Sequence, residues 1–223
     1  MKMTAVRDCV AGLLAGAAVV LSGCGAAPDE VEQSAEPPAE VADPPEDVSL
    51  DDQPVGLPVE NSELFDAVGN LLRPKDHHEW VFVGAPVTPN DMNDGKAAFP
   101  EFHNVYINPA NFAWYKQTGE FPNGTVILKE LVSVGSKSMA SGNGYFQGDF
   151  VSLEAMVKDT GRFSEEPGGW AFFRFGEAPD YAATGARMKT ADCNVCHASA
   201  GEDYVFTSTY PVLRAAKKRA NKE

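Results

Sequence analysis

The sequence is short of cysteine, of basic residues and of long apolar runs, and each shortage excludes a class of protein. Four cysteines among 223 residues are too few to indicate a disulfide-stapled scaffold. Lysine and arginine number 18 against 32 aspartate and glutamate residues, so no basic field is present to attract nucleic acid. The apolar run at 10–21 is shorter than the roughly 20 residues that a transmembrane helix needs. No internal repeat of useful period is visible, which excludes a repeat architecture.

The first 23 residues, 1–23, have the pattern of a bacterial export signal. Lys2 and Arg7 supply positive charge before the apolar run, and small residues follow it up to Cys24. The segment ending at Cys24 resembles a lipobox, which implies cleavage before this cysteine, lipid on its thiol and amine, and stable membrane anchoring through several acyl chains. Gly25 rather than aspartate follows, as in outer-membrane lipoproteins that face the periplasm. A plain signal peptide that is cleaved elsewhere is the alternative.

Residues 24–60 are predicted to be a lipidated cysteine followed by an acidic, proline-rich linker. The stretch from 25 to 60 holds eleven acidic residues and seven prolines, and it contains no lysine, arginine or aromatic residue. Such a composition cannot bury enough apolar surface to offset the entropy of ordering, so the linker is predicted to be disordered. Fully extended, it would reach roughly 110 Å at about 3.1 Å per residue. The sequence therefore predicts a tether that holds a folded domain away from a membrane.

The strongest motif is the pentapeptide CNVCH at 193–197. Two cysteines three residues apart, with a histidine directly after them, form the attachment signature of a c-type haem. The thiols of Cys193 and Cys196 would each add to one vinyl group of the porphyrin, and His197 would supply the proximal axial bond to iron. A redox Cys-x-x-Cys would need a strand before it in a βαβ setting, and a zinc site would need further ligands at short spacing. The other two cysteines belong to the signal and the lipobox, so none remains for a disulfide.

Residues 61–223 are predicted to form one α+β domain, a predominantly antiparallel β-sheet with a few short helices. The length suits a single hydrophobic core, and the net charge of this part is only about −4 once the signal and linker charges are removed. Hairpin and turn signals outnumber βαβ spacings, which favours antiparallel pairing. The predicted elements are strands at 80–84, 102–108, 125–135, 145–157 and 170–175, an extended piece at 204–209, an amphipathic start at 63–72, helices at 110–118 and 211–221, and a hairpin at 141–144 with an Asn143-Gly144 turn.

The longest clean strand, 125–135, carries a charge among apolar residues. One face presents Lys129 between Ile127 and Leu131, and the other face presents Glu130. A buried lysine loses its proton readily, and the neutral amine is nucleophilic. The alternative is an edge-strand lysine whose ammonium group reaches water.

Several stretches of residues 61–223 together resemble cytochrome P-460, the cross-linked-haem hydroxylamine oxidase of ammonia- and methane-oxidising bacteria. These stretches are 80–84, 93–96, 105–106, 118–121, 124–135, 141–146, 167–170, 193–197 and 210–214. The resemblance implies a predominantly β homodimer with one haem c of the P-460 type per chain, in which Lys129 bonds covalently to a porphyrin meso carbon. It also implies oxidation of hydroxylamine to nitrous oxide, nitric oxide or nitrite, with electrons passing to another cytochrome. The N-terminal tether departs from the soluble periplasmic form of the family.

Oxidation of hydroxylamine releases protons, so a carboxylate near the open face of the iron is expected. Glu154 and Asp149, on the strand after the hairpin, are the candidates, although each is equally compatible with a solvated strand residue. His103 is a candidate distal hydrogen-bonding group, and a histidine satisfied in the core is the alternative. His77 and His78, beside acidic neighbours, are interpreted as an exposed turn. The aromatic residues that could restrict the pocket are Phe99, Phe102 and Trp80.

Two other functions stay open from the sequence. The related cytochrome c′-beta shares the fold, lacks the cross-link and binds nitric oxide in an apolar pocket, so Lys129 is the residue that separates it from the enzyme. A plain electron carrier would need a sixth iron ligand such as methionine. Met139, Met156 and Met188 are available, but none lies in a recognisable ligand loop.

Overall fold

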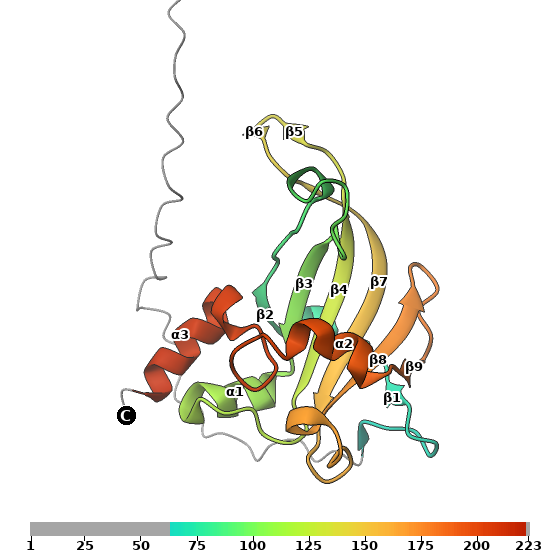
Figure 1. Cartoon of the computed structure of the whole chain (residues 1–223), viewed down its shortest axis with the longest axis vertical. Helices are drawn as coiled ribbons and strands as arrows, with labels where there is room; N and C mark the ends of the chain where they lie inside the picture. Colours follow the sequence, from blue (N-terminus) through green and yellow to red (C-terminus); the bar gives the residue numbers. More distant parts are fainter. Residues whose placement is uncertain (1–62, 222–223) are drawn as a thin grey trace, which may run out of the picture. The chain divides into compact units, whose positions relative to one another are not determined.

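The computed structural model describes residues 63–221, so the predicted export signal, the lipidated Cys24 and the acidic linker lie outside the described residues. The described part is built on a seven-stranded sheet in which neighbouring strands are antiparallel, in the order β1-β9-β8-β7-β4-β3-β2 (Figure 1). The strands are β1 (Leu71–Leu72), β2 (Val81–Gly84), β3 (Phe102–Ile107), β4 (Val126–Val134), β7 (Gln147–Lys158), β8 (Trp170–Glu177) and β9 (Thr184–Arg187). A separate small hairpin pairs β5 (Ser138–Met139) with β6 (Gly142–Asn143).

Three α-helices accompany the sheet: α1 (Pro109–Thr118), α2 (Thr190–His197) and α3 (Pro211–Ala220). Proline opens α1 and α3, where its missing N–H costs nothing, and α1 ends at Gly119 in the left-handed conformation (φ 72°). Short 3₁₀ turns complete the structure: η2 (His77–Glu79), η3 (Asn90–Met92), η4 (Pro167–Gly169) and η5 (Thr207–Thr209). Within residues 63–221 no helix has the length and apolar character to cross a membrane. The predicted α+β class is confirmed.

The sheet separates two hydrophobic cores because side chains alternate along each strand. On one face, Ile127 of β4 and Met156 of β7 pack with residues of α1 and α3. On the other face, Leu128 and Leu153 pack with the segment around Phe65. The alternation predicted for 125–135 is therefore confirmed, and it places Lys129 and Glu130 on opposite faces of the sheet.

Two local predictions were wrong because short-range hydrogen bonds override the sequence pattern. The segment at 63–72 is a bend leading into β1, since the Asp66 carboxylate accepts the backbone N–H groups of Val68 (3.0 Å) and Asn70 (2.8 Å) and thereby competes with helix. The segment at 204–209 is not extended but turns through η5, where the Thr209 hydroxyl donates to the Phe206 carbonyl (2.8 Å).

The hairpin predicted near 141–144 is present, but its turn lies elsewhere. Asn143 pairs with Ser138 and Gly142 pairs with Met139, so the two loop residues are Ala140 and Ser141. The backbone N–H of Gly144 donates to the Lys137 carbonyl (3.0 Å), which keeps the predicted turn residues inside the ladder.

Candidate functional site

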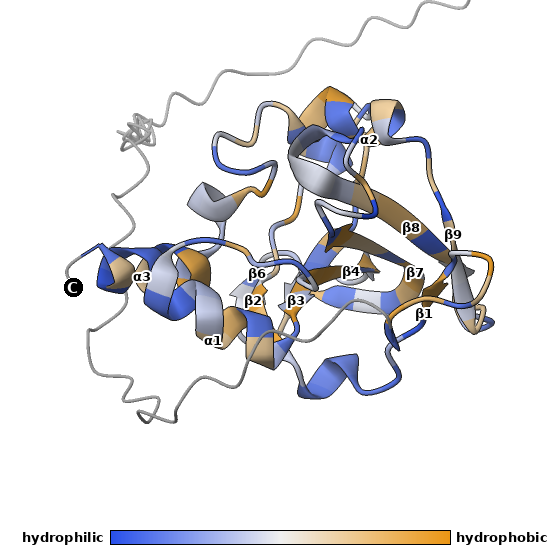
Figure 2. Ribbon diagram, turned by 90° about the horizontal axis from the view of Figure 1, so that it is seen from below, coloured by the Kyte–Doolittle hydropathy of each residue, from blue (hydrophilic) through white to orange (hydrophobic). Residues whose placement is uncertain are grey.

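The predicted haem-attachment residues lie together on one short helix. In α2, Cys196 and His197 follow Cys193 by three and four residues, the spacing that places side chains on one helix face. The Cys193 side chain is half-buried and packs against the core formed with Met156 and Phe172, whereas Cys196 is exposed. Figure 1 and Figure 2 both place α2 across the sheet beside β8, and the His197 ring lies 4.8 Å from the Phe172 ring.

The imidazole of His197 is held in one orientation by the chain that follows α2. Its Nδ1 atom lies 2.8 Å from the Tyr204 carbonyl oxygen, so Nδ1–H donates and Nε2 is left free to bind a metal. The ring also contacts Phe172 and Phe206, with the Phe206 centroid 5.0 Å away. Because the ring is hydrogen-bonded and contacts two aromatic rings, His197 suits the role of an axial ligand to haem iron.

The turn that carries this carbonyl is itself strained and anchored. Asp203 and Tyr204 both have positive φ angles (46° and 60°), a conformation that costs free energy for residues other than glycine. The Asp203 carboxylate accepts a hydrogen bond from Trp170 Nε1 (3.2 Å) and forms an ion pair with Lys158. These two anchors from β8 and β7 hold the turn in place under His197.

The predicted cross-linking lysine lies on the sheet face that also receives the side chains of α2. Lys129 of β4 is opposite Glu154 of β7 in the ladder, and Lys129 Nζ is 2.9 Å from Glu154 Oε2. Both side chains are largely buried, with exposed fractions of 25% for Lys129 and 14% for Glu154. The ring of Phe99 covers the ammonium group at 4.2 Å. Desolvation offsets much of the attraction between two buried charges, so this pair by itself contributes little net stability.

His103 lies on the same sheet face. It is two residues before Val105, the β3 residue that pairs with Lys129. Its Nε2 atom is buried and has no hydrogen-bond partner among the described residues. Burial and, to a smaller extent, the charge of Lys129 lower the pKa of His103 to about 4, against the opposing effects of a bond to the Phe99 backbone and the charge of Glu154. A neutral imidazole with an orphaned nitrogen is the feature expected beside a group that the polypeptide alone does not supply.

The sheet residues and the helix residues share one electrostatic environment. Burial raises the pKa of the Cys193 thiol, with the charge of Glu154 acting in the same direction and that of Lys129 opposing it. Burial lowers the pKa of His197, although its bond to Tyr204 and the charge of Glu154 act the other way. The charge of Lys129 lowers the pKa of His197 as well. Cys193, Cys196 and His197 therefore have the chemistry to hold a haem, and Lys129, Glu154 and His103 lie on the sheet face against which Cys193 packs.

Other predicted site residues lie apart from this group. Asp149 is exposed near the start of β7, where its backbone N–H donates to the Ser133 hydroxyl (2.9 Å). Trp80 packs in the core on the opposite sheet face, so the expectation that it restricts the pocket is wrong. Phe102 neighbours His103 on β3 and consequently points to the other face, whereas Phe99 is in ring contact with His103 at 5.8 Å.

Sequence reasoning missed two features. Tyr204, with its anchors Trp170 and Asp203, carries no motif that marks it as the support of His197. The pair His77–His78, interpreted as an exposed turn, has a buried first member that faces Glu130, although His78 is exposed. Tyr204 lies only seven residues after His197, but no sequence motif marks a carbonyl group as a hydrogen-bond acceptor, whereas Glu130 lies more than fifty residues from His77 and His78.

The family model for cytochrome P-460 matches residues 74–207. The matched range contains β2 to β9, the Lys129–Glu154 pair and the whole of α2, and it leaves out β1 and α3. No curated protein matches the chain.

Proposed function

This chain belongs to the cytochrome P-460 family of haem cytochromes, and we propose that it is a mono-haem c-type cytochrome that oxidises hydroxylamine and passes the electrons to another cytochrome. Cys193 and Cys196 would carry the porphyrin and His197 would be the proximal ligand. The haem supplies the redox centre when bound, and the polypeptide supplies orientation, proton transfer and exclusion of water. The proposed products are nitrous oxide, nitric oxide or nitrite.

The observation that carries the proposal is the Lys129–Glu154 pair on the sheet face beside α2. A lysine ammonium is not a nucleophile, but the carboxylate 2.9 Å away is in position to accept its proton. With its proton on Glu154, the Lys129 amine would have the free electron pair that the porphyrin cross-link implied by the family resemblance requires. Glu154 would afterwards serve as acceptor for the protons that hydroxylamine releases, while neutral His103 holds the substrate by a hydrogen bond.

The same ion pair also supports a second candidate, a nitric-oxide-binding protein without the cross-link. If Lys129 remains a charged partner of Glu154, its amine cannot bond to the porphyrin. The electron-carrier alternative rests on methionine: Met156 is in the core on the α2 side of the sheet and Met188 packs against it, whereas Met139 is exposed in β5.

Three measurements on the protein purified with its haem separate these functions. The proposed enzyme should show a strongly red-shifted Soret band when reduced, a tryptic haem peptide with two chains (one containing 193–197 and one containing Lys129), and turnover of hydroxylamine. An ordinary c-type spectrum with a single-chain haem peptide would support the nitric-oxide binder. A six-coordinate low-spin spectrum would support the electron carrier.

We further propose that the protein works as a homodimer, tethered on the periplasmic side of the outer membrane. The support is the lipobox-like segment at Cys24, which lies outside the described residues, together with the family resemblance. Radiolabelled lipid should be incorporated into the wild-type protein and lost in Cys24→Ser, which should appear soluble in the periplasm. Retention of Cys24→Ser on membranes would contradict the anchor.

A further inference from the structure

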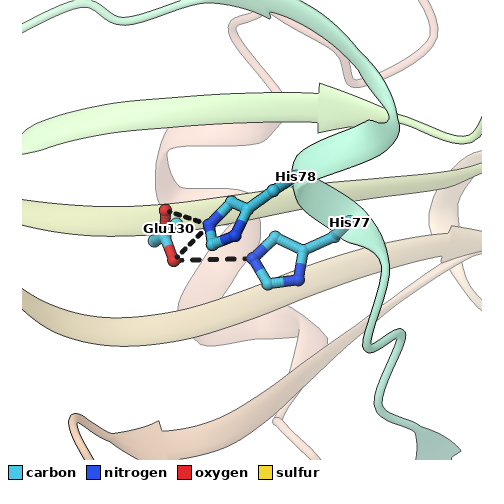
Figure 3. Close-up of side chains that lie close together, drawn as sticks. All are labelled: His77, His78 and Glu130. Carbon is cyan, nitrogen blue, oxygen red and sulfur yellow. Dashed lines mark hydrogen bonds and ion pairs between the residues drawn. The ribbon is translucent and has the colours of Figure 1, made fainter.

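Three side chains of metal-ligand type converge on the sheet face opposite Lys129. Glu130 follows Lys129 in β4 and so points the other way, toward η2 (Figure 3). His78 Nε2 lies 3.2 Å from both carboxylate oxygens of Glu130, and His77 Nε2 lies 3.5 Å from Oε1. Within residues 63–221 this is the one group of three or more such side chains whose ligand atoms gather closely, all within 4.8 Å of one another.

The contact between His77 and Glu130 brings together two buried groups that need a proton or a cation between them. The Glu130 side chain is 2% exposed, and that of His77 is 7% exposed. His77 Nδ1 lies 3.3 Å from the Pro74 carbonyl oxygen, which can only accept, so Nδ1 carries the proton. The Nε2 atom of a neutral His77 is then an acceptor that faces the carboxylate, another acceptor. Two buried acceptors in this position require a proton or a cation between them.

The spacing of the atoms favours a cation. Charge-assisted hydrogen bonds between nitrogen and a carboxylate usually measure about 2.7–2.9 Å, whereas the distances here are 3.2–3.5 Å. A tetrahedral ion with nitrogen and oxygen ligands at about 2.0–2.1 Å separates neighbouring ligand atoms by about 3.3 Å. The nitrogen–oxygen separations therefore match the edges of such a tetrahedron better than they match direct ion pairs, and the two histidine nitrogens lie within 4.8 Å of each other.

We propose that His77, His78 and Glu130 bind one divalent transition-metal ion of the zinc class, at a site separate from the haem. The Pro74 carbonyl fixes the ring of His77 and its tautomer, as second partners of metal-bound histidines commonly do. The side chain of His78 is 55% exposed, so the fourth position of the ion is open to water. The ion fastens η2 to β4 at the residue directly after Lys129, which stiffens the strand on which the haem site depends.

The surroundings of the group suit a rigid site. The Tyr106 ring lies edge-on to His77 at 5.8 Å and to His78 at 5.9 Å, and Phe150 stacks on His78 at 6.1 Å. These rings restrict the rotamers of both histidines, so little side-chain entropy is lost when the ion binds.

The test is zinc binding to the full-length haem protein after removal of metal with a chelator. Isothermal titration with zinc chloride and elemental analysis should give one zinc per chain, counted separately from iron. His78→Gln and Glu130→Gln should each weaken binding about tenfold or more. Glu79→Gln removes an exposed acid from the same turn without touching the three ligands, and it should bind zinc like the wild type. Zinc should raise the unfolding temperature of the wild type and of Glu79→Gln only.

If Glu130→Gln does not fold, His78→Gln carries the test of zinc binding, because His78 is exposed and its replacement leaves the core intact. Equal zinc affinity in His78→Gln and the wild type would overturn the proposal, as would a wild type that takes up no zinc. Equal weakening in Glu79→Gln would also overturn it, since the negative charge around this turn, rather than the three proposed ligands, would then be holding the metal. The result is independent of hydroxylamine turnover, so the proposed function can fail while this site stands.

Discussion

Lys129 Nζ and Glu154 Oε2 are 2.9 Å apart, directly opposite each other on β4 and β7, on the sheet face beside Cys193 and His197. The two side chains are close enough for direct proton transfer. Under the proposed function, the Glu154 carboxylate accepts a proton first from Lys129 and later from hydroxylamine. The first two predictions follow from this pair.

Replacing Glu154 by glutamine removes the proposed proton acceptor with little change in volume. Hydroxylamine oxidation should fall by about 10²-fold or more, the usual contribution of a positioned general base. Asp149→Asn, on the same strand but exposed, is the matched control and should keep nearly full activity. Steady-state assays of both variants across pH check this. A larger loss in Asp149→Asn would transfer the role of proton acceptor to that residue.

Replacing Lys129 by leucine keeps roughly the same volume but leaves the largely buried Glu154 carboxylate without its cation, so the free energy of unfolding should fall by about 3 kcal/mol. The cross-link cannot form, and the reduced spectrum should become that of an ordinary c-type haem. Hydroxylamine oxidation should fall sharply, while nitric oxide binding persists. Spectroscopy, peptide mass analysis and urea unfolding measure these effects. A wild-type spectrum identical to that of Lys129→Leu would count against a cross-link.

The low pKa of His103 links stability to pH. This pKa is about 4 in the folded protein against an ordinary value of 6.5, so the unfolded state binds more protons between these values. The stabilisation is fully present above pH 6.5 and is lost as pH falls toward 4. His103→Gln should remove this dependence, amounting to on the order of 2 kcal/mol at pH 4.5. Urea unfolding of both proteins from pH 7 to 4.5 checks it; a pH-independent difference would refute it.

Replacing Trp170 by phenylalanine removes the indole N–H that donates to Asp203 but keeps an aromatic ring in the core. The turn that presents the Tyr204 carbonyl should loosen, which weakens the hydrogen bond from His197 Nδ1 and makes the imidazole a poorer donor to iron. The reduction potential of the haem should rise. A tenfold change in the ratio of the His197 affinities for ferric and ferrous iron corresponds to about 59 mV. Potentiometric titration measures this. Phe206→Leu, which alters the packing of the ring and leaves the bond, should shift the potential less.

The order of side chains along β4 could be predicted from the sequence because strand alternation is a local property. Lys129 and Glu130 had to point to opposite faces once the strand existed. The same holds for α2, where Cys193, Cys196 and His197 share a face by their spacing alone. The hairpin turn and the bend at 63–72 were mispredicted because single hydrogen bonds, such as those of Asp66, outweigh weak local preferences.

The sequence by itself determined the haem motif, the α+β class and the two faces of the long strand. Only the tertiary structure decided which face α2 would cover, that Glu154 rather than Asp149 would meet Lys129, and that Tyr204 would support His197. It also decided that His77 and His78 would meet Glu130, more than fifty residues later in the chain. These contacts depend on the register between strands and on the course of the loops. Both are determined by the packing of the two cores as a whole, and no short stretch of sequence specifies them.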